Sequence, residues 1–130
     1  MKFNHVANRL DAAHFELVVE MFTTRLGFVE LRRTERAIWL RQPGTNVDLQ
    51  FGRSATIHRD DDKQRSQVSF LSLTPREELD VLAAWLGERG LAAMVGAYSE
   101  REFYLDAPAA FVDFVIEAMR PELAEYGVAV

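Results

Sequence analysis

One stretch of the sequence occurs twice. Residues 34–51 read TERAIWLRQPGTNVDLQF, and residues 99–116 read SEREFYLDAPAAFVDFVI. The two copies align without a gap at an offset of 65 residues (position 34 with position 99), and Trp39 and Tyr104 place an aromatic residue at the same point. An internal repeat of this kind in a short chain indicates two copies of one supersecondary unit.

The length, composition and charge of the chain exclude several classes of protein. At 130 residues the chain is long enough for a single domain, 1–130, with its own core. The absence of cysteine excludes disulfides, thiolate metal sites and cysteine nucleophiles. There is no apolar run of membrane-spanning length and no signal-peptide pattern, so we expect a cytoplasmic protein without a membrane partner. A net charge of −5 without a basic stripe argues against nucleic acid as a partner.

The first copy completes a β-α-β-β-β pattern over residues of about 1–52. Apolar residues recur at helical spacing between Asp11, which has an N-cap side chain, and Gly27, which is typical of a helix end. Proline, glycine and asparagine in residues 42–46 predict a turn. Extended patterns predict strands at residues 2–8, 28–33, 37–41 and 47–51.

The second copy repeats this pattern over residues of about 66–119. Residues 53–65 are polar and aperiodic, which predicts a linker between the two modules. Residues 74–77 (TPRE) form a capping-box sequence ahead of a helix that ends at Gly90. Strands are predicted at residues 66–73, 92–95, 102–105 and 111–118, and a short C-terminal tail at residues 120–130.

The alternation of residues along the predicted strands places polar side chains on one face. In strand 111–118 the even-numbered positions are apolar and suit packing against a helix, which leaves Asp113 and Glu117 on the opposite face. The predicted strand 47–51 has Asp48 and Gln50 on its polar side, and the predicted strand 66–73 has Gln67 and Ser69 there. The face that the helices do not cover is therefore either solvated or the lining of a cavity.

Four segments resemble the motifs of one superfamily. They are residues 4–6 (NHV), 21–28 (MFTTRLGF), 67–70 (QVSF) and 106–113 (DAPAAFVD). The chain resembles the vicinal oxygen chelate superfamily of glyoxalases, bleomycin resistance proteins and extradiol dioxygenases. This resemblance implies an α+β fold in which two βαβββ modules pair into a curved, partly open mixed-sheet barrel around a small-molecule site.

The resemblance also implies ligands for a divalent metal on the first and last strands of the modules. His5 and Gln67 match two ligand positions, and the third is either Asp113, which the repeat selects, or Glu117, which has the longer carboxylate side chain. The two carboxylates lie about 13 Å apart along one strand, so they cannot both bind one ion. Such a donor set suits Zn, Ni, Mn, Fe or Mg acting as a Lewis acid, and Asp113 or Glu117 would also serve as the catalytic base.

Two interpretations of function stay open. The first is a glyoxalase- or dioxygenase-like enzyme, a metal-dependent lyase, isomerase or dioxygenase that acts on a small oxygen-rich molecule. The second is a metal-independent, drug-sequestering binding protein of the bleomycin-resistance kind, with no cofactor. A third interpretation is a regulatory module without chemistry. The resemblance also implies a homodimer. The candidate substrate-binding residues are Trp39, Asp48, Gln50, Ser69 and Tyr104.

Overall fold

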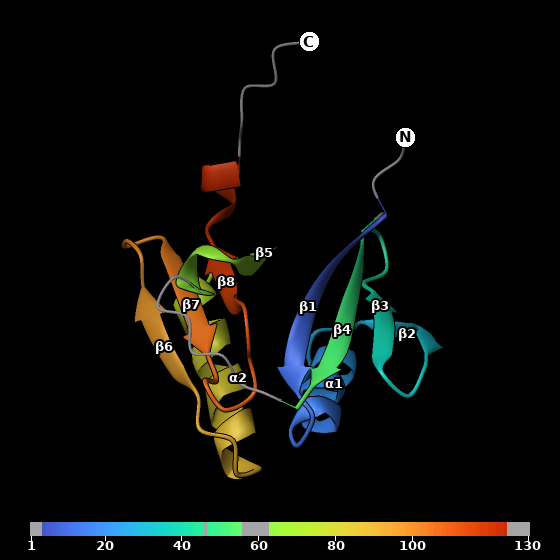
Figure 1. Ribbon diagram of the computed structural model, residues 1–130. Coiled ribbons are helices and arrows are strands. Elements are labelled where there is room, and N and C mark those ends of the chain that lie inside the picture. Colours follow the sequence, from blue (N-terminus) through green and yellow to red (C-terminus); the bar gives the residue numbers. More distant parts are fainter. Residues whose placement is uncertain (1–3, 46, 56–62, 125–130) are drawn as a thin grey trace. The chain divides into compact units, whose positions relative to one another are not determined.

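The chain forms two compact units, each built from one sheet and one α-helix. In the computed structural model, residues 4–45, 47–55 and 63–124 are described (Figure 1). One unit comprises Met1–Asp60 with Pro108–Asp113, and the other comprises Asp61–Ala107 with Phe114–Val130. Each has the β-α-β-β-β order and an open, mixed sheet of four strands, which confirms the predicted α+β class of two βαβββ modules.

The sheet of unit 1 has the strand order β1-β4-β3-β2. β1 (His5–Asp11) runs parallel to β4 (Asp48–Ser54), and β3 (Ala37–Arg41) runs antiparallel to both β4 and β2 (Val29–Arg33). The helix α1 (Phe15–Thr24) connects β1 to β2. β3 has the predicted bounds, whereas β4 extends through Ser54; of the predicted linker, residues 56–62 lie outside the described residues.

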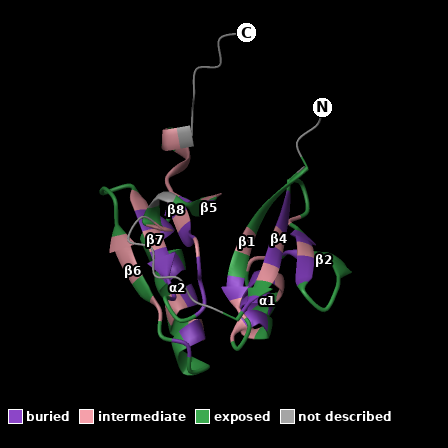
Figure 2. Cartoon of the chain, viewed as in Figure 1, coloured by how far each residue is buried: buried purple, intermediate pink, exposed green. Residues whose placement is uncertain are grey.

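α1 packs on its sheet through one apolar stripe. Phe15, Val18, Val19 and Phe22 follow helical spacing and are at most 4% exposed (Figure 2). Phe22 meets the ring of Phe51 edge-on at a centroid distance of 5.0 Å. Burial of each such large side chain contributes about 1.5–3 kcal/mol, so this stripe fixes which face of the sheet the helix covers.

The two ends of α1 compare differently with the sequence. Gly27 has a φ of 72°, the left-handed conformation that ends helices, as predicted. Asp11, however, does not cap the helix: it is the last residue of β1, where it pairs with Ser54. The helix starts later, after His14, and the Asp11 carboxylate instead accepts a hydrogen bond from the Ala13 amide at 3.0 Å. Asp11, which the local sequence assigned to the helix start, is thus part of the strand β1 because it pairs with β4.

The sheet of unit 2 has the strand order β5-β8-β7-β6. β5 (Gln67–Leu71) runs parallel to β8 (Val115–Met119), and β7 (Glu102–Asp106) runs antiparallel to both β8 and β6 (Met94–Ala97). The unit also contains α2 (Pro75–Glu88) and the short 3-10 helices η1 (Lys63–Arg65) and η2 (Pro121–Ala124). Within the described ranges, neither α-helix has the length and apolarity needed to cross a bilayer.

The start of α2 lacks the predicted capping box. Pro75 is the first helical residue as expected, but the Thr74 side chain makes no capping hydrogen bond. Ser72 instead holds the turn before the helix: its hydroxyl accepts a hydrogen bond from the Thr74 amide at 3.0 Å and donates to the Glu78 carboxylate. Because Ser72 is buried, its hydroxyl needs these partners, and the turn before the helix satisfies them.

The segment Pro108–Asp113 belongs to unit 1, although it follows β7 and precedes β8. Phe111 forms a β-bridge with Leu10 of β1, and the Asp11 amide donates to the Ala110 carbonyl at 2.9 Å. The predicted strand 111–118 is therefore wrong over its first half, because Phe111 forms a bridge with β1, the Val112 amide donates to the Arg9 carbonyl, and β8 starts only at Val115.

The same departure changes which residues of the two units are equivalent. Asp48 lies opposite His5, the first residue of β1, whereas Val115 lies opposite Gln67, the first residue of β5. The structural offset at the last strand is therefore 67 (48 to 115), two residues more than the gapless repeat indicates. Asp113, which the repeat matched to Asp48, is not its structural counterpart.

Candidate small-molecule site

The face of the unit 2 sheet opposite its helix carries a row of polar side chains across three strands. Ser69 in β5 lies opposite Glu117 in β8, and Glu117 lies opposite Tyr104 in β7. Gln67 lies two residues before Ser69 and therefore on the same face. The other face of β8 carries the buried Ile116. The structure thus places four of the predicted site residues on one face of one unit.

Glu117 is the charged centre of this face. Its side chain is half-buried, and its Oε1 atom accepts a hydrogen bond from the Ser69 hydroxyl at 2.8 Å. Among the residues that the structure describes, no lysine, arginine or histidine forms an ion pair with Glu117. Ser69 holds one carboxylate oxygen, so the other is the acceptor available to a ligand.

The Tyr104 ring of this row packs against a second tyrosine, Tyr98. The rings of Tyr98 and Tyr104 lie 4.9 Å apart between centroids, at an interplanar angle of 42°. The Tyr98 hydroxyl donates to the Gln64 carbonyl at 2.5 Å and accepts from the Gln67 amide nitrogen at 3.4 Å. Burial, with a smaller contribution from the negative charge of Glu117, raises the pKa of the Tyr98 hydroxyl. The hydroxyl of Tyr98 therefore stays protonated and neutral at this face.

Tyr98 and Gln64 were not predicted from the sequence. Tyr98 lies two residues after Gly96 and follows β6 directly, so strand alternation carried one residue past the strand would have placed it on the same face as Gly96. Gln64 acts through its backbone carbonyl, which no side-chain pattern reveals.

A buried ion pair lies further along β7 on the same face. Lys63 Nζ is 2.6 Å from Asp106 Oδ1, and the two side chains are only 11% and 9% exposed. Asp106 is two residues from Tyr104 and shares its side of the strand. These two charges compensate each other, whereas Glu117 has no ion pair with a lysine, arginine or histidine among the described residues.

The corresponding face of unit 1 is organised around an arginine. Arg41 donates to both oxygens of Asp48, with Nε–Oδ1 at 2.5 Å and Nη2–Oδ2 at 3.1 Å. This hydrogen bonding, together with the positive charge of Arg41, lowers the pKa of Asp48. His5 is exposed and its Nδ1 atom lies 2.9 Å from Asn4 Oδ1. Both oxygens of the predicted ligand-binding carboxylate Asp48 are therefore engaged within the fold.

Trp39 and Gln50 lie opposite each other on β3 and β4. The guanidinium carbon of Arg32 lies 4.9 Å from the centroid of the Trp39 ring. One aromatic face of Trp39 thus already binds a cation from its own chain. The role of Trp39 and Gln50 as substrate-binding residues stays a prediction.

Asp113 attaches the segment Pro108–Asp113 to β1. Its carboxylate accepts hydrogen bonds from the Arg9 backbone amide at 3.1 Å and from Arg9 Nε at 3.2 Å, and the side-chain nitrogen Nδ2 of Asn8 lies 3.5 Å away. These contacts explain a carboxylate at this position without a ligand. Asp113 belongs to unit 1, whereas Glu117 belongs to unit 2.

The predicted metal ligands are divided between the units, with His5 and Asp113 in unit 1 and Gln67 and Glu117 in unit 2. Within residues 4–45, 47–55 and 63–124 there is no group of three histidine or carboxylate side chains that could hold an ion. Asp113 is paired with Arg9, and unit 2 taken alone offers one amide and one carboxylate, short of the three protein ligands of a catalytic metal. The described donor sets of the separate units do not fit a metal, and the ligand roles stay predictions.

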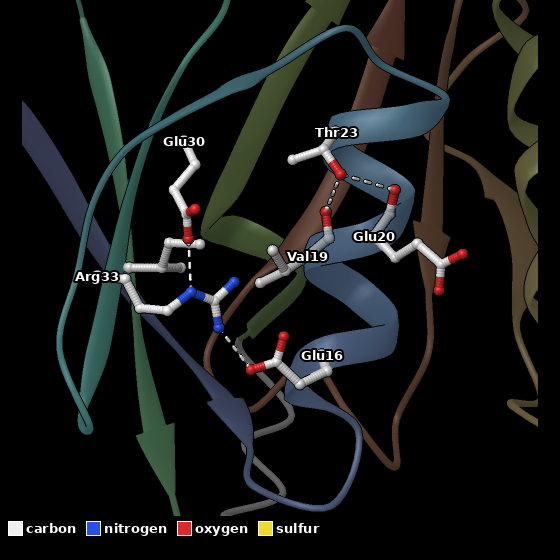
Figure 3. Close-up of a pocket in the computed structure, with 7 residues that line it drawn as sticks. Glu16, Val19, Glu20, Thr23, Glu30 and Arg33 are labelled. Carbon is white, nitrogen blue, oxygen red and sulfur yellow. Dashed lines mark hydrogen bonds and ion pairs between the residues drawn. The ribbon is translucent and has the colours of Figure 1, made fainter.

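A cavity of about 260 Å³ lies on the helix side of unit 1, between α1 and strands β2 and β3. Figure 3 shows the Arg33 guanidinium between Glu30 and Glu16. Arg33 donates to Glu30 at 2.5 Å and to Glu16 at 2.6 Å, and Arg53 also donates to Glu16. Burial favours neutral Glu16, but its bonds to the two arginines outweigh this and lower the pKa of Glu16. Glu16 and Glu30 in this cavity are thus paired with arginines, unlike Glu117.

Comparisons with known proteins agree on the fold. No protein-family model matches the sequence, and neither does any curated protein. Among solved structures, a possible glyoxalase from Bacillus cereus is similar at 19% identity, with a TM-score of 0.59 and coverage of 92% of this chain and 98% of that one. A lactoylglutathione lyase from Agrobacterium tumefaciens is similar at 11% identity, with a TM-score of 0.56 and coverage of 96% and 97%.

A third structure is the bleomycin-binding protein of Streptomyces verticillus in complex with copper(II)-bleomycin, at 16% identity, a TM-score of 0.52 and coverage of 92% and 98%. The fold is therefore the one shared by these glyoxalase and bleomycin-binding structures. At these identities the similarity establishes the fold, and function must be argued from the site.

Proposed function

We propose that the protein binds a small organic cation without a metal ion. The cation binds on the face of the unit 2 sheet opposite α2, which we call the open face. The observation that carries this proposal is Glu117, a half-buried carboxylate that is fixed by Ser69 and has no basic partner among the described residues. This is the metal-independent interpretation of the sequence. The solved bleomycin-binding protein shows that the same fold can bind a small molecule.

Electrostatics favour a positively charged ligand at this position. Partial burial of a carboxylate raises its energy, and a cation that reaches the uncommitted oxygen recovers it through a charge-assisted hydrogen bond. At an effective dielectric constant of about 20, two unit charges 4 Å apart attract by about 4 kcal/mol before desolvation is counted. The net charge of −5 adds a weaker, long-range attraction for cations.

The proposal is tested by titrating the wild type and the Glu117→Gln variant with an organic ammonium ion in buffer that contains EDTA. The amide is nearly isosteric with the carboxylate but uncharged, so we expect the affinity to fall at least about tenfold. Glu77→Gln is the matched control, because it removes the same charge from an exposed position of α2. Equal affinity for the wild type and Glu117→Gln would refute the proposed site.

The metal-dependent interpretation makes a different prediction. Gln67 and Glu117 lie on one face of neighbouring strands, which is where the resemblance places ligands from the first and last strands of a module. If Ni, Mn, Fe or Zn raises the melting temperature of the wild type, and this gain is lost in both His5→Ala and Glu117→Gln, the metal-independent proposal is wrong. We expect no such gain.

A further inference from the structure

Gly96 in β6 lies directly opposite Tyr104 in β7, and the tyrosine ring lies over it. A Cβ atom at position 96 would be 2.3 Å from Tyr104 Cζ and 2.4 Å from its hydroxyl oxygen. Both distances are far below van der Waals contact. The ring can occupy this place only because residue 96 has no side chain.

The position of this ring determines what surrounds Glu117. Glu117 pairs with Tyr104 from β8, on the side of β7 opposite to β6. A Tyr104 ring that lies over β6 therefore leans away from Glu117. In that position it packs against the ring of Tyr98, whose hydroxyl is anchored on the Gln64 carbonyl. The result is an aromatic surface of two rings beside a carboxylate.

We propose that Gly96 is a positioning residue that makes this site selective for planar aromatic cations. This inference rests on the proposed function and names the ligand class. The electron-rich faces of Tyr98 and Tyr104 favour both a flat ring and a positive charge, while Glu117 supplies the counter-charge. A methyl group at position 96 would drive the Tyr104 ring off β6, and the two-ring surface would be lost.

Two probes of equal charge and similar size separate the aromatic contribution from the ionic one. Benzylammonium and cyclohexylmethylammonium differ only in whether their ring is flat and aromatic. In the wild type we expect benzylammonium to bind about three- to tenfold more tightly, the range that aromatic contacts provide. The Gly96→Ala variant should lose this preference and retain its affinity for cyclohexylmethylammonium to within about twofold.

The chain offers a matched control. Gly52 in the strand β4 is also a strand glycine but, unlike Gly96, has room for a methyl group, since a Cβ atom there would meet only backbone oxygens at 3.9 and 4.0 Å. Gly52→Ala should therefore keep the preference for benzylammonium. Both measurements are followed by NMR titration, which reports weak binding and also shows whether each variant is folded.

A double-mutant cycle connects the effect to Tyr104. If Gly96 acts by placing that ring, Gly96→Ala changes nothing once Tyr104 is alanine, and Tyr104→Ala alone abolishes the preference for the flat probe. The Tyr104→Ala measurement decides the question even if Gly96→Ala does not fold.

The outcomes distinguish this inference from the proposed function. Suppose that the wild type binds both cations and that Gly96→Ala or Tyr104→Ala keeps the same preference for benzylammonium. This result overturns the role of Gly96 and leaves the proposed function standing. An equal loss of both cations in Gly96→Ala also overturns it, because a general structural defect would act that way. Failure of the wild type to bind either cation overturns both.

Discussion

Replacing Phe111 by alanine should destabilise unit 1. Phe111 belongs to this unit although residues 61–107 of unit 2 lie between it and the rest of unit 1 in the sequence. Phe111 is 0% exposed and forms a β-bridge with Leu10, which is also fully buried. Truncation of a fully buried phenylalanine costs about 3–5 kcal/mol in the free energy of unfolding. A domain of this size has about 5–15 kcal/mol in total, so the melting temperature should fall by roughly 10–20 °C.

Urea denaturation measures the size of this loss, and amide hydrogen exchange shows where it occurs. The Asp11 amide donates to the Ala110 carbonyl, so its exchange should accelerate in Phe111→Ala. Val81→Ala is the control: Val81 is a 50% exposed apolar residue of α2, and its truncation should change stability by about 0.5 kcal/mol or less.

Two results would contradict this account of Phe111. One is a loss of less than about 1 kcal/mol, which is too small for a buried ring of this size. The other is faster exchange in β8 with unchanged exchange in β1. That pattern would indicate that residues 111–113 belong to the strand 111–118 that the sequence predicted.

Three further predictions concern an ion pair, a helix end and assembly. Arg41 lowers the pKa of Asp48, so the stabilisation is present above the ordinary aspartate pKa of about 4 and is lost as the pH falls through the lowered value. The stability difference between the wild type and Asp48→Asn should therefore shrink below about pH 4 in urea titrations, and a difference that widens in acid would reverse the sign. Gly27→Ala should cost about 1 kcal/mol in thermal unfolding because position 27 has a φ of 72°, and no loss would contradict the left-handed helix end. Sedimentation should show the homodimer that the resemblance implies, and a single monomeric species would remove that prediction.

Local patterns predicted the parts of the fold that depend on neighbouring residues. The apolar stripe of α1 and the glycine after it fix a helix whichever strands it packs on, and β3 has the predicted bounds Ala37–Arg41. The repeat also predicted the two βαβββ modules correctly. The alternation placed Gln67, Ser69 and Glu117 on one face, as the strand registers show.

The errors arose where the partner is distant in the sequence. An alternating apolar pattern continues from residue 111 to residue 118, but alternation does not specify which strand a segment pairs with. Phe111 forms a bridge with Leu10 of β1, about a hundred positions earlier, and the nearby contact between Arg9 and Asp113 has no local signal. The same ambiguity made Asp113 and Asp48 look equivalent.

The ion pair of unit 1 could have been predicted. Arg41 and Asp48 flank the turn predicted at residues 42–46 and lie opposite each other on β3 and β4. Counting outward from the turn brings the two charges together on adjacent strands. That count would have assigned Asp48 to an ion pair before any ligand role was considered.

The location of a bound organic cation tests the central claim most directly. Amide chemical shifts of the protein, titrated with benzylammonium in metal-free buffer, report which residues the ligand approaches. The account predicts that the shifts concentrate on the open face of unit 2, at Ser69, Tyr104 and Glu117, and vanish in Glu117→Gln. Shifts confined to the charged cavity between α1 and β2, or shifts that persist unchanged in Glu117→Gln, would contradict it.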